Sequence, residues 1–183
     1  MALDKAALKS AFEAILTFDP STPVTYTGDY MATQWADAID TYSQGAVDEL
    51  SNAVVGATLT ANKPALLSAL KSLFNTVPTG SSDYRPTIDS AITAYWTGVT
   101  FASTLVPPDG QPGSGISNAV TTPGSGFNPE NSWTSSPLFP TEDESADRLA
   151  NAIDTATKAT KTTIAYVTPP PASSPTTKVL SIS

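Results

Sequence analysis

A Pro/Gly-rich stretch over residues 105–140 is the feature that most limits how this chain can fold. It holds seven of the chain's 16 prolines and five of its 10 glycines, and Pro-Gly-Ser-Gly occurs twice in it, at 112–115 and 123–126. Proline interrupts helices and sheets, and glycine raises the entropic cost of ordering a chain. Structureless loops of this length are uncommon inside a compact domain. We therefore expect 105–140 to be an extended arm between two helical parts.

Apolar side chains on both sides of this arm recur every three or four residues, as in amphipathic helices. Gly56 fits the C-terminal end of the second helix, and Asn62 the N-cap of the third. Thr141 and Glu144 form the capping-box pattern that starts the fifth. The expected helices span residues 3–17, 29–55, 63–77, 83–101 and 141–161.

After Lys161 the pattern changes to period two, which predicts short strands at 162–167 and 178–182 around Pro169-Pro170-Pro171. These strands could pair with each other or add to a neighbour's sheet. We predict a mainly α fold, a bundle of about five helices with a long Pro/Gly-rich extended segment and a short C-terminal β hairpin or strand-addition arm. The expected division is 1–104 (helical bundle), 105–140 (extended arm), 141–167 (fifth helix and a strand that complete the bundle) and 168–183 (C-terminal extended arm).

Cysteine and histidine are both absent from the sequence. Disulfides, thiolate nucleophiles and zinc–thiolate sites are therefore excluded, as are the Ser-His and Cys-His pairs of nucleophilic catalysis. The net charge is −8, and the nine Lys and Arg residues are scattered singly. Because nucleic acids and anionic membranes are bound through clustered cations, we expect no direct contact with either. No apolar stretch reaches the ~18 residues of a membrane span.

Three short patterns could carry chemistry, and each has a simpler structural explanation. Ser68-x-x-Lys71 matches the first motif of serine penicillin-recognising enzymes, but the second motif is missing and Ser68 lies within an expected helix. Asp37 and Asp40 are one helical turn apart and could hold a hard cation, or form a solvated face. The acidic run 142–144 suits the positive end of a helix dipole without any calcium. We expect no catalytic, cofactor-binding or metal-binding residue, and no enzyme; an enzyme based only on carboxylates is the remaining catalytic hypothesis.

Large apolar side chains also occur in segments that have no local core. Aromatic residues in the Pro-rich arm would anchor it in a pocket, either on its own domain or on a partner. Without such contacts we expect 105–140 and 168–183 to be disordered in an isolated chain. The candidate partner contacts are Phe127, Trp133, Phe139, Val179, Leu180 and Ile182.

Three segments resemble small virion structural proteins of tailed phages. They are the opening Met-Ala-Leu-Asp-Lys-Ala-Ala-Leu-Lys, the Ala-Ile-Thr-Ala-Tyr-Trp-Thr-Gly-Val-Thr-Phe of residues 91–101, and the Ala-Asp-Arg-Leu-Ala-Asn-Ala-Ile-Asp of residues 146–154. The second is followed by the Pro/Gly-rich stretch and the third by Thr-rich, strand-like sequence, so that the likeness covers residues 1–20 and 85–167. The resemblance implies a position in the capsid decoration, neck or tail, and it implies no catalytic activity.

We therefore expect a non-enzymatic component of a phage particle, a capsid decoration or cement, neck or tail protein, whose extended arms stabilise neighbouring subunits. Its partners would be other virion structural proteins and copies of itself. It would be made in the host cytoplasm and located in the virion, because the N-terminus lacks the basic start and apolar run of a signal peptide. The alternative is a host-facing receptor- or carbohydrate-binding module of a virion or cell surface, in which Tyr26, Tyr30 or Trp133 would stack on the ligand.

Overall fold

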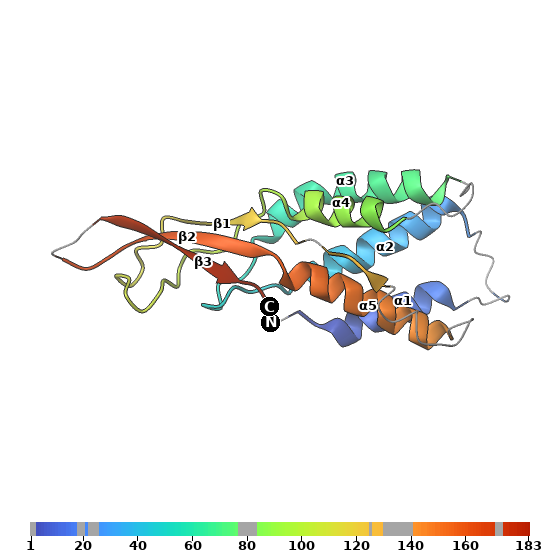
Figure 1. The fold of residues 1–183 in the computed structure, drawn as a ribbon, viewed down its shortest axis with the longest axis horizontal. Helices are drawn as coiled ribbons and strands as arrows, with labels where there is room; N and C mark the ends of the chain where they lie inside the picture. Colours follow the sequence, from blue (N-terminus) through green and yellow to red (C-terminus); the bar gives the residue numbers. More distant parts are fainter. Residues whose placement is uncertain are drawn as a thin grey trace.

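The structure, a computed structural model, describes residues 3–17, 21, 26–76, 84–124, 126–129, 141–170 and 174–183. The molecule is elongated, with its helices gathered at one end and a sheet that projects from them at the other (Figure 1). The helices are α1 (Lys5–Leu16), α2 (Gly28–Ser43), α3 (Gly56–Phe74), α4 (Arg85–Trp96) and α5 (Glu142–Lys158).

The sheet has three antiparallel strands in the order β1 (Ser117–Thr122), β2 (Lys161–Val167) and β3 (Pro175–Ser181). The mainly α fold with C-terminal strands agrees with the sequence, and β2 and β3 pair with each other along their full length. The prediction of a hairpin alone was wrong, because β1 from the Pro/Gly-rich stretch adds a third strand. Its six residues are rich in Ser, Thr and Asn, and its pairing with β2 shifts register after Val120.

The second helix is shorter than expected, because a buried carboxylate ends the helical pattern. α2 stops at Ser43, and Asp48, which is 2% exposed, accepts hydrogen bonds from the backbone N–H groups of Leu50 and Asn52. An aspartate that bonds to the backbone just after it favours a turn over a helix. The turn places Ser51 at a φ of 69°.

The third helix starts earlier than predicted, and Asn62 has a different role. α3 begins at Gly56, so Gly56 starts a helix where it was expected to end one. The side-chain amide of Asn62 donates to the backbone carbonyls of Tyr95 and Thr97 at 2.8 Å. Asn62 thus satisfies carbonyl groups at the C-terminal end of α4, which no helical hydrogen bond can reach.

The fourth helix ends five residues before its predicted end. Its last residue is Trp96, and Gly98 follows with a φ of +73°. This left-handed conformation after a helix is the one that glycine adopts most easily. Val99 and Phe101 therefore leave the helix and run along β1, where the N–H of Phe101 donates to Asn118 and the carbonyl of Val99 accepts from Val120.

The start of the fifth helix confirms the predicted capping box. The backbone N–H of Glu144 donates to the Thr141 hydroxyl, and the Glu144 carboxylate accepts from the Thr141 N–H. The reciprocal pair satisfies two of the donors that a helix N-terminus leaves free.

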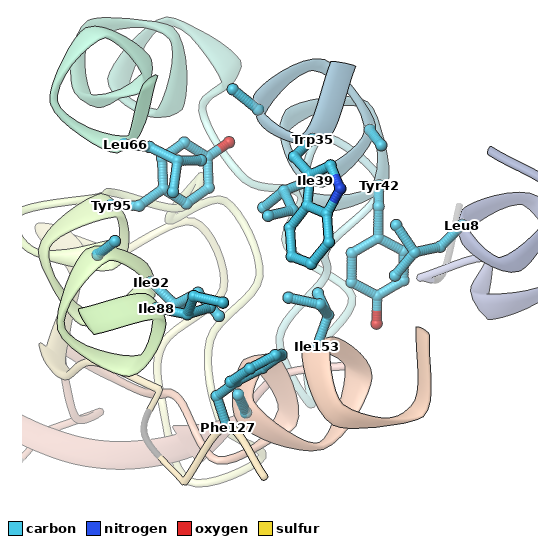
Figure 2. Packing of buried hydrophobic residues seen from close by; sticks show 14 of the residues in the cluster. Leu8, Trp35, Ile39, Tyr42, Leu66, Ile88, Ile92, Tyr95, Phe127 and Ile153 are labelled. Atoms are coloured by element: carbon cyan, nitrogen blue, oxygen red, sulfur yellow. The ribbon is translucent and has the colours of Figure 1, made fainter. Parts of the chain in front are cut away.

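All five helices contribute to one core (Figure 2). Trp35 of α2 packs edge-on against Phe12 of α1 and Phe74 at the end of α3, with ring centroids 5.0 and 5.2 Å apart. Ile153 brings α5 into the same cluster, and Phe127 lies directly beside it. No helix in the described part of the chain is long and apolar enough to cross a membrane.

The described part of 105–140 does not extend away from the molecule as an arm. Residues 111–116 run beside β2, where the N–H of Ile116 donates to Ala165 and that of Gln111 to Val167. Gly124 then lies against α5 so closely that an added Cβ would fall 2.0 Å from the Ala156 carbonyl oxygen. Glycine is required here because the backbone itself fills the space between α4 and α5.

Candidate functional site

The six candidate contact residues fall into three groups. Phe127 is 3% exposed and belongs to the chain's own core, and Leu180 and Ile182 are buried as well. Val179, by contrast, is 60% exposed. Trp133 and Phe139 lie outside the described residues. Among the placed candidates, only Val179 offers its side chain to a partner, and it lies on β3.

The two faces of the sheet differ because side chains alternate along each strand. Ile164, Tyr166 and Leu180 point to one face and pack against Leu50 and Val106, which forms a second, smaller core under the sheet. The opposite face has Lys161 at its base, where the ammonium donates to the Ser181 hydroxyl, and otherwise carries small uncharged side chains that are exposed or half-buried. They are Ala119, Thr163, Ala165, Val167, Thr177 and Val179.

The two edges of the sheet also differ. The β1 edge is covered, since Thr100 pairs with Ala119 and residues 99–101 run alongside. The base of the β3 edge is covered too: the N–H of Glu49 donates to the Ser181 carbonyl, and the N–H of Ser181 donates to the Glu49 carboxylate. Val47 and Ser183 exchange two further backbone bonds.

Beyond this cover, the outer edge of β3 is free. Backbone groups alternate along a strand, so the N–H and C=O groups of Thr177 and Val179 point the same way as those of Ser181, away from β2. None of them is hydrogen-bonded to any residue that the structure describes. We call the backbone groups of Thr177 and Val179, together with the Pro175 carbonyl, the open edge.

The carboxylates that the sequence singled out are paired within the chain. Lys63 contacts both Asp37 and Asp40, at 2.8 and 3.3 Å, so a cation already occupies the space between them. In the acidic run, Asp143 pairs with Lys9 and Glu142 accepts from the Thr17 hydroxyl. Within the described residues, no group of three or more His, Cys, Asp or Glu side chains could hold a metal ion.

The motif Ser68-x-x-Lys71 has no catalytic geometry. Ser68 is exposed on α3, and the Lys71 ammonium pairs with Asp29 at 3.2 Å. The Asn75 amide and the Lys71 ammonium hold the pKa of the Asp29 carboxyl below its usual range. Lys71 thus connects α3 to the start of α2 and is not directed at a nucleophile.

Two buried tyrosines donate to aspartates, an arrangement that can also be catalytic. The Tyr42 hydroxyl donates to Asp154 at 2.5 Å, and the Tyr95 hydroxyl donates to Asp40 at 2.7 Å. Burial, with the aspartate adding to it, raises the pKa of both tyrosines. Both hydroxyls therefore keep their protons, and the pairs join α2 to α5 and α2 to α4.

A groove of about 640 Å³ runs between α1 and α2. Its lining is mainly apolar and short, with Ala7, Ala11 and Ala14 from α1 and Ala38 from α2. Asp4 and Asp37 are its charged residues. Tyr30, Gln34, Thr41 and Gln44 add polar side chains to the lining.

Comparison of the chain with protein-family models, with curated proteins and with solved structures gave no match. The candidate site is therefore chosen from the structure, and it is the open edge of β3. The sequence indicated that the C-terminal strands could add to a neighbour's sheet, but it did not indicate which edge would be open. Pro175 and Lys178 were the available signal, because proline and lysine are typical of edge strands.

Proposed function

We propose that the protein is a non-enzymatic structural component of a tailed-phage particle, a capsid decoration, neck or tail protein that holds neighbouring subunits through its projecting sheet. The observation that carries this proposal is the open edge of β3. An exposed row of backbone donors and acceptors is a template for pairing with another chain. In the described part of this sheet, the other edge and the base of β3 are covered, so the unpaired backbone groups are confined to the stretch from Pro175 to Val179.

The shape of the molecule supports the same proposal. The helices form a compact body with its own core, and the sheet extends from that body (Figure 1). A projecting strand can reach a neighbour without rearrangement of the bundle. The side chains next to Thr177 and Val179 on this face are uncharged, and Lys161 lies further away, at the base of the sheet. Covering the part of the face beside the open edge therefore requires little desolvation of charge.

The sequence supports the assignment of the protein to a phage particle. The segments 1–9, 91–101 and 146–154 resemble phage virion proteins, and the chain as a whole is poor in charge, with 14% Asp, Glu, Lys and Arg. Low charge suits repeated packing contacts among many copies. The capsid, neck and tail all offer such contacts, and the proposal extends equally to each of them.

Quantitative mass spectrometry of purified particles tests this proposal. Particles from the lysate that contains the protein are separated by density gradient and washed at high salt. We expect the chain to sediment with the particles at a fixed ratio to the major capsid protein in every preparation. A ratio that varies between preparations or falls to zero on washing would refute a structural role.

A second candidate function is a host-facing binding module. Tyr26, which is 38% exposed, lies against Tyr30 at a centroid distance of 5.7 Å. Exposed tyrosines are common at carbohydrate sites, but this pair is edge-on, at 84°, and so offers no continuous flat platform. A glycan array with the wild-type chain and Tyr26→Ala tests it, since retention that is lost in the variant would favour the module.

A further inference from the structure

The open edge has a defined pattern of donors and acceptors. Thr177 and Val179 each offer an N–H and a C=O, whereas Pro175 offers only its C=O. The intervening Thr176 and Lys178 point their backbone groups to β2, where they pair with Tyr166 and Ile164. A strand that adds to this edge must therefore match three consecutive outward positions.

A second copy of β3 can supply such a strand in antiparallel orientation, but most registers are obstructed. A register centred on Val179 would place Thr177 opposite Ser181 of the second copy, and Glu49 already occupies the backbone of Ser181. A register centred on Lys178 places Pro175 opposite Ser181 and also brings the two Lys178 side chains directly together. Like charges directly opposite each other destabilise a strand pair.

The register centred on Thr177 avoids both conflicts. Thr177 faces Thr177 of the second copy and exchanges two backbone hydrogen bonds with it. Each Val179 N–H donates to the Pro175 carbonyl of the other copy, which adds two more. The Pro175 nitrogen, which has no hydrogen, needs no partner, and the exposed Val179 side chain packs beside Pro175.

Charge on the other face of the strand is compatible with this register. Lys178 lies opposite Thr176 of the second copy, which pairs in turn with Tyr166. The Tyr166 hydroxyl donates to the exposed Asp109 carboxylate at 2.9 Å, so an acidic group lies over the same face. The two Lys178 side chains are diagonal neighbours, about 7–8 Å apart, and solvent screens their repulsion. Each lies on the same face of the sheet as the Asp109 carboxylate of the other chain.

We infer that β3 pairs with β3 of a second copy, in antiparallel orientation about Thr177, to form a continuous six-stranded sheet across a two-fold axis. The inference rests on the proposed function and names one partner of the open edge. The pairing adds four backbone hydrogen bonds and two Val179–Pro175 apolar contacts. Contacts between two short strands bury far less than the ~1,000 Å² that a stable interface needs. The contact therefore forms when copies are concentrated, as on a particle.

Because the chain has no cysteine, single cysteine variants test the pairing without background. Thr177→Cys would place two thiols on strands whose Cα atoms are about 5.5 Å apart. Two Val179→Cys thiols would be separated by four residues along the sheet, about 13 Å. The probe is a short bis-maleimide, added across a dilution series of each folded variant, with folding checked by circular dichroism.

We expect Thr177→Cys to cross-link several-fold faster than Val179→Cys. Ser68→Cys, on the exposed surface of α3, gives the rate of random collision. Cross-linking of Thr177→Cys at the Ser68→Cys rate, or faster cross-linking of Val179→Cys, would overturn the inferred pairing. If self-pairing fails while the chain remains at a fixed ratio in purified particles, only the identity of the partner is wrong; absence from particles removes the proposed function itself.

Discussion

The backbone N–H of Phe127 donates to the Asp89 carboxylate at 2.8 Å, which fixes the Pro/Gly-rich segment to α4. The Thr93 hydroxyl adds a second bond, to the Gly124 carbonyl. Phe127 itself is 3% exposed, and its ring closes the core beside Ile153 (Figure 2). This part of the segment is therefore a component of the helical body.

Phe127→Ala should destabilise the whole fold. Truncation of a buried phenylalanine leaves a cavity and typically costs about 3–5 kcal/mol. We expect a loss of this size in the free energy of unfolding, measured by urea denaturation. Ile116→Ala is the control, since Ile116 lies in the same segment but is 60% exposed, and it should change stability little. Equal effects of the two variants would show that the segment is not docked as described.

Asp48→Ala should be destabilising for a different reason. Asp48 accepts from the side-chain amides of Asn52 and Asn118 and from two backbone N–H groups, and all three side chains are buried. Without the carboxylate these donors lose their partner, which should cost about 2–5 kcal/mol. Asp37→Ala, on an exposed ion pair, should cost less than about 1 kcal/mol. Comparable unfolding midpoints for the two variants would contradict the network.

Glu49 should make the base of the hairpin sensitive to acid. Hydrogen bonds from Ser181, with attraction from Lys161 and Lys178, hold the pKa of the Glu49 carboxyl below its ordinary value of 4.5. A depressed pKa means that the carboxylate stabilises the folded state above pH 4.5, and that this contribution is lost as the pH falls through the folded-state pKa.

Amide exchange of Ser181 as a function of pH measures this effect. We expect the protection of Ser181, corrected for intrinsic exchange, to fall on acidification in the wild type. In Glu49→Gln the protection should be lower at neutral pH and nearly independent of pH over the same range. A wild-type profile as flat as that of the variant would show that Glu49 does not anchor the strand.

Local sequence signals predicted the presence of the five helices, but not the helix ends that depend on long-range contacts. The capping box at Thr141 and Glu144 is a pattern within one turn, and it was read correctly. The end of α2 depends instead on Asp48, which needs Asn118, 70 residues away, to complete its bonds. Nothing between residues 44 and 55 reveals that distant partner, so an apolar helical pattern was extended through a turn.

The same limit explains the strand that was missed. β1 has weak strand propensity and follows a Pro-Gly-Ser-Gly segment, so composition favoured an extended arm. Its position is set by β2 on one side and by residues 99–101 on the other. The location of the open edge could not be predicted either. The alternation of side chains along a strand indicates its two faces, but it does not indicate which edge lacks a neighbouring strand.

The open edge is the central claim, and Thr177→Pro tests it most directly. Proline at 177 removes one outward N–H but leaves the hydrogen bonds between β2 and β3 intact, because proline is tolerated on an edge strand. Thr176→Pro is the matched control, since its N–H faces β2 and its loss should unfold the hairpin. Each variant would be expressed beside the wild-type chain and its amount measured in gradient-purified particles. We predict that Thr177→Pro folds normally, by circular dichroism, but is strongly depleted from particles; incorporation equal to that of the wild type would contradict the account.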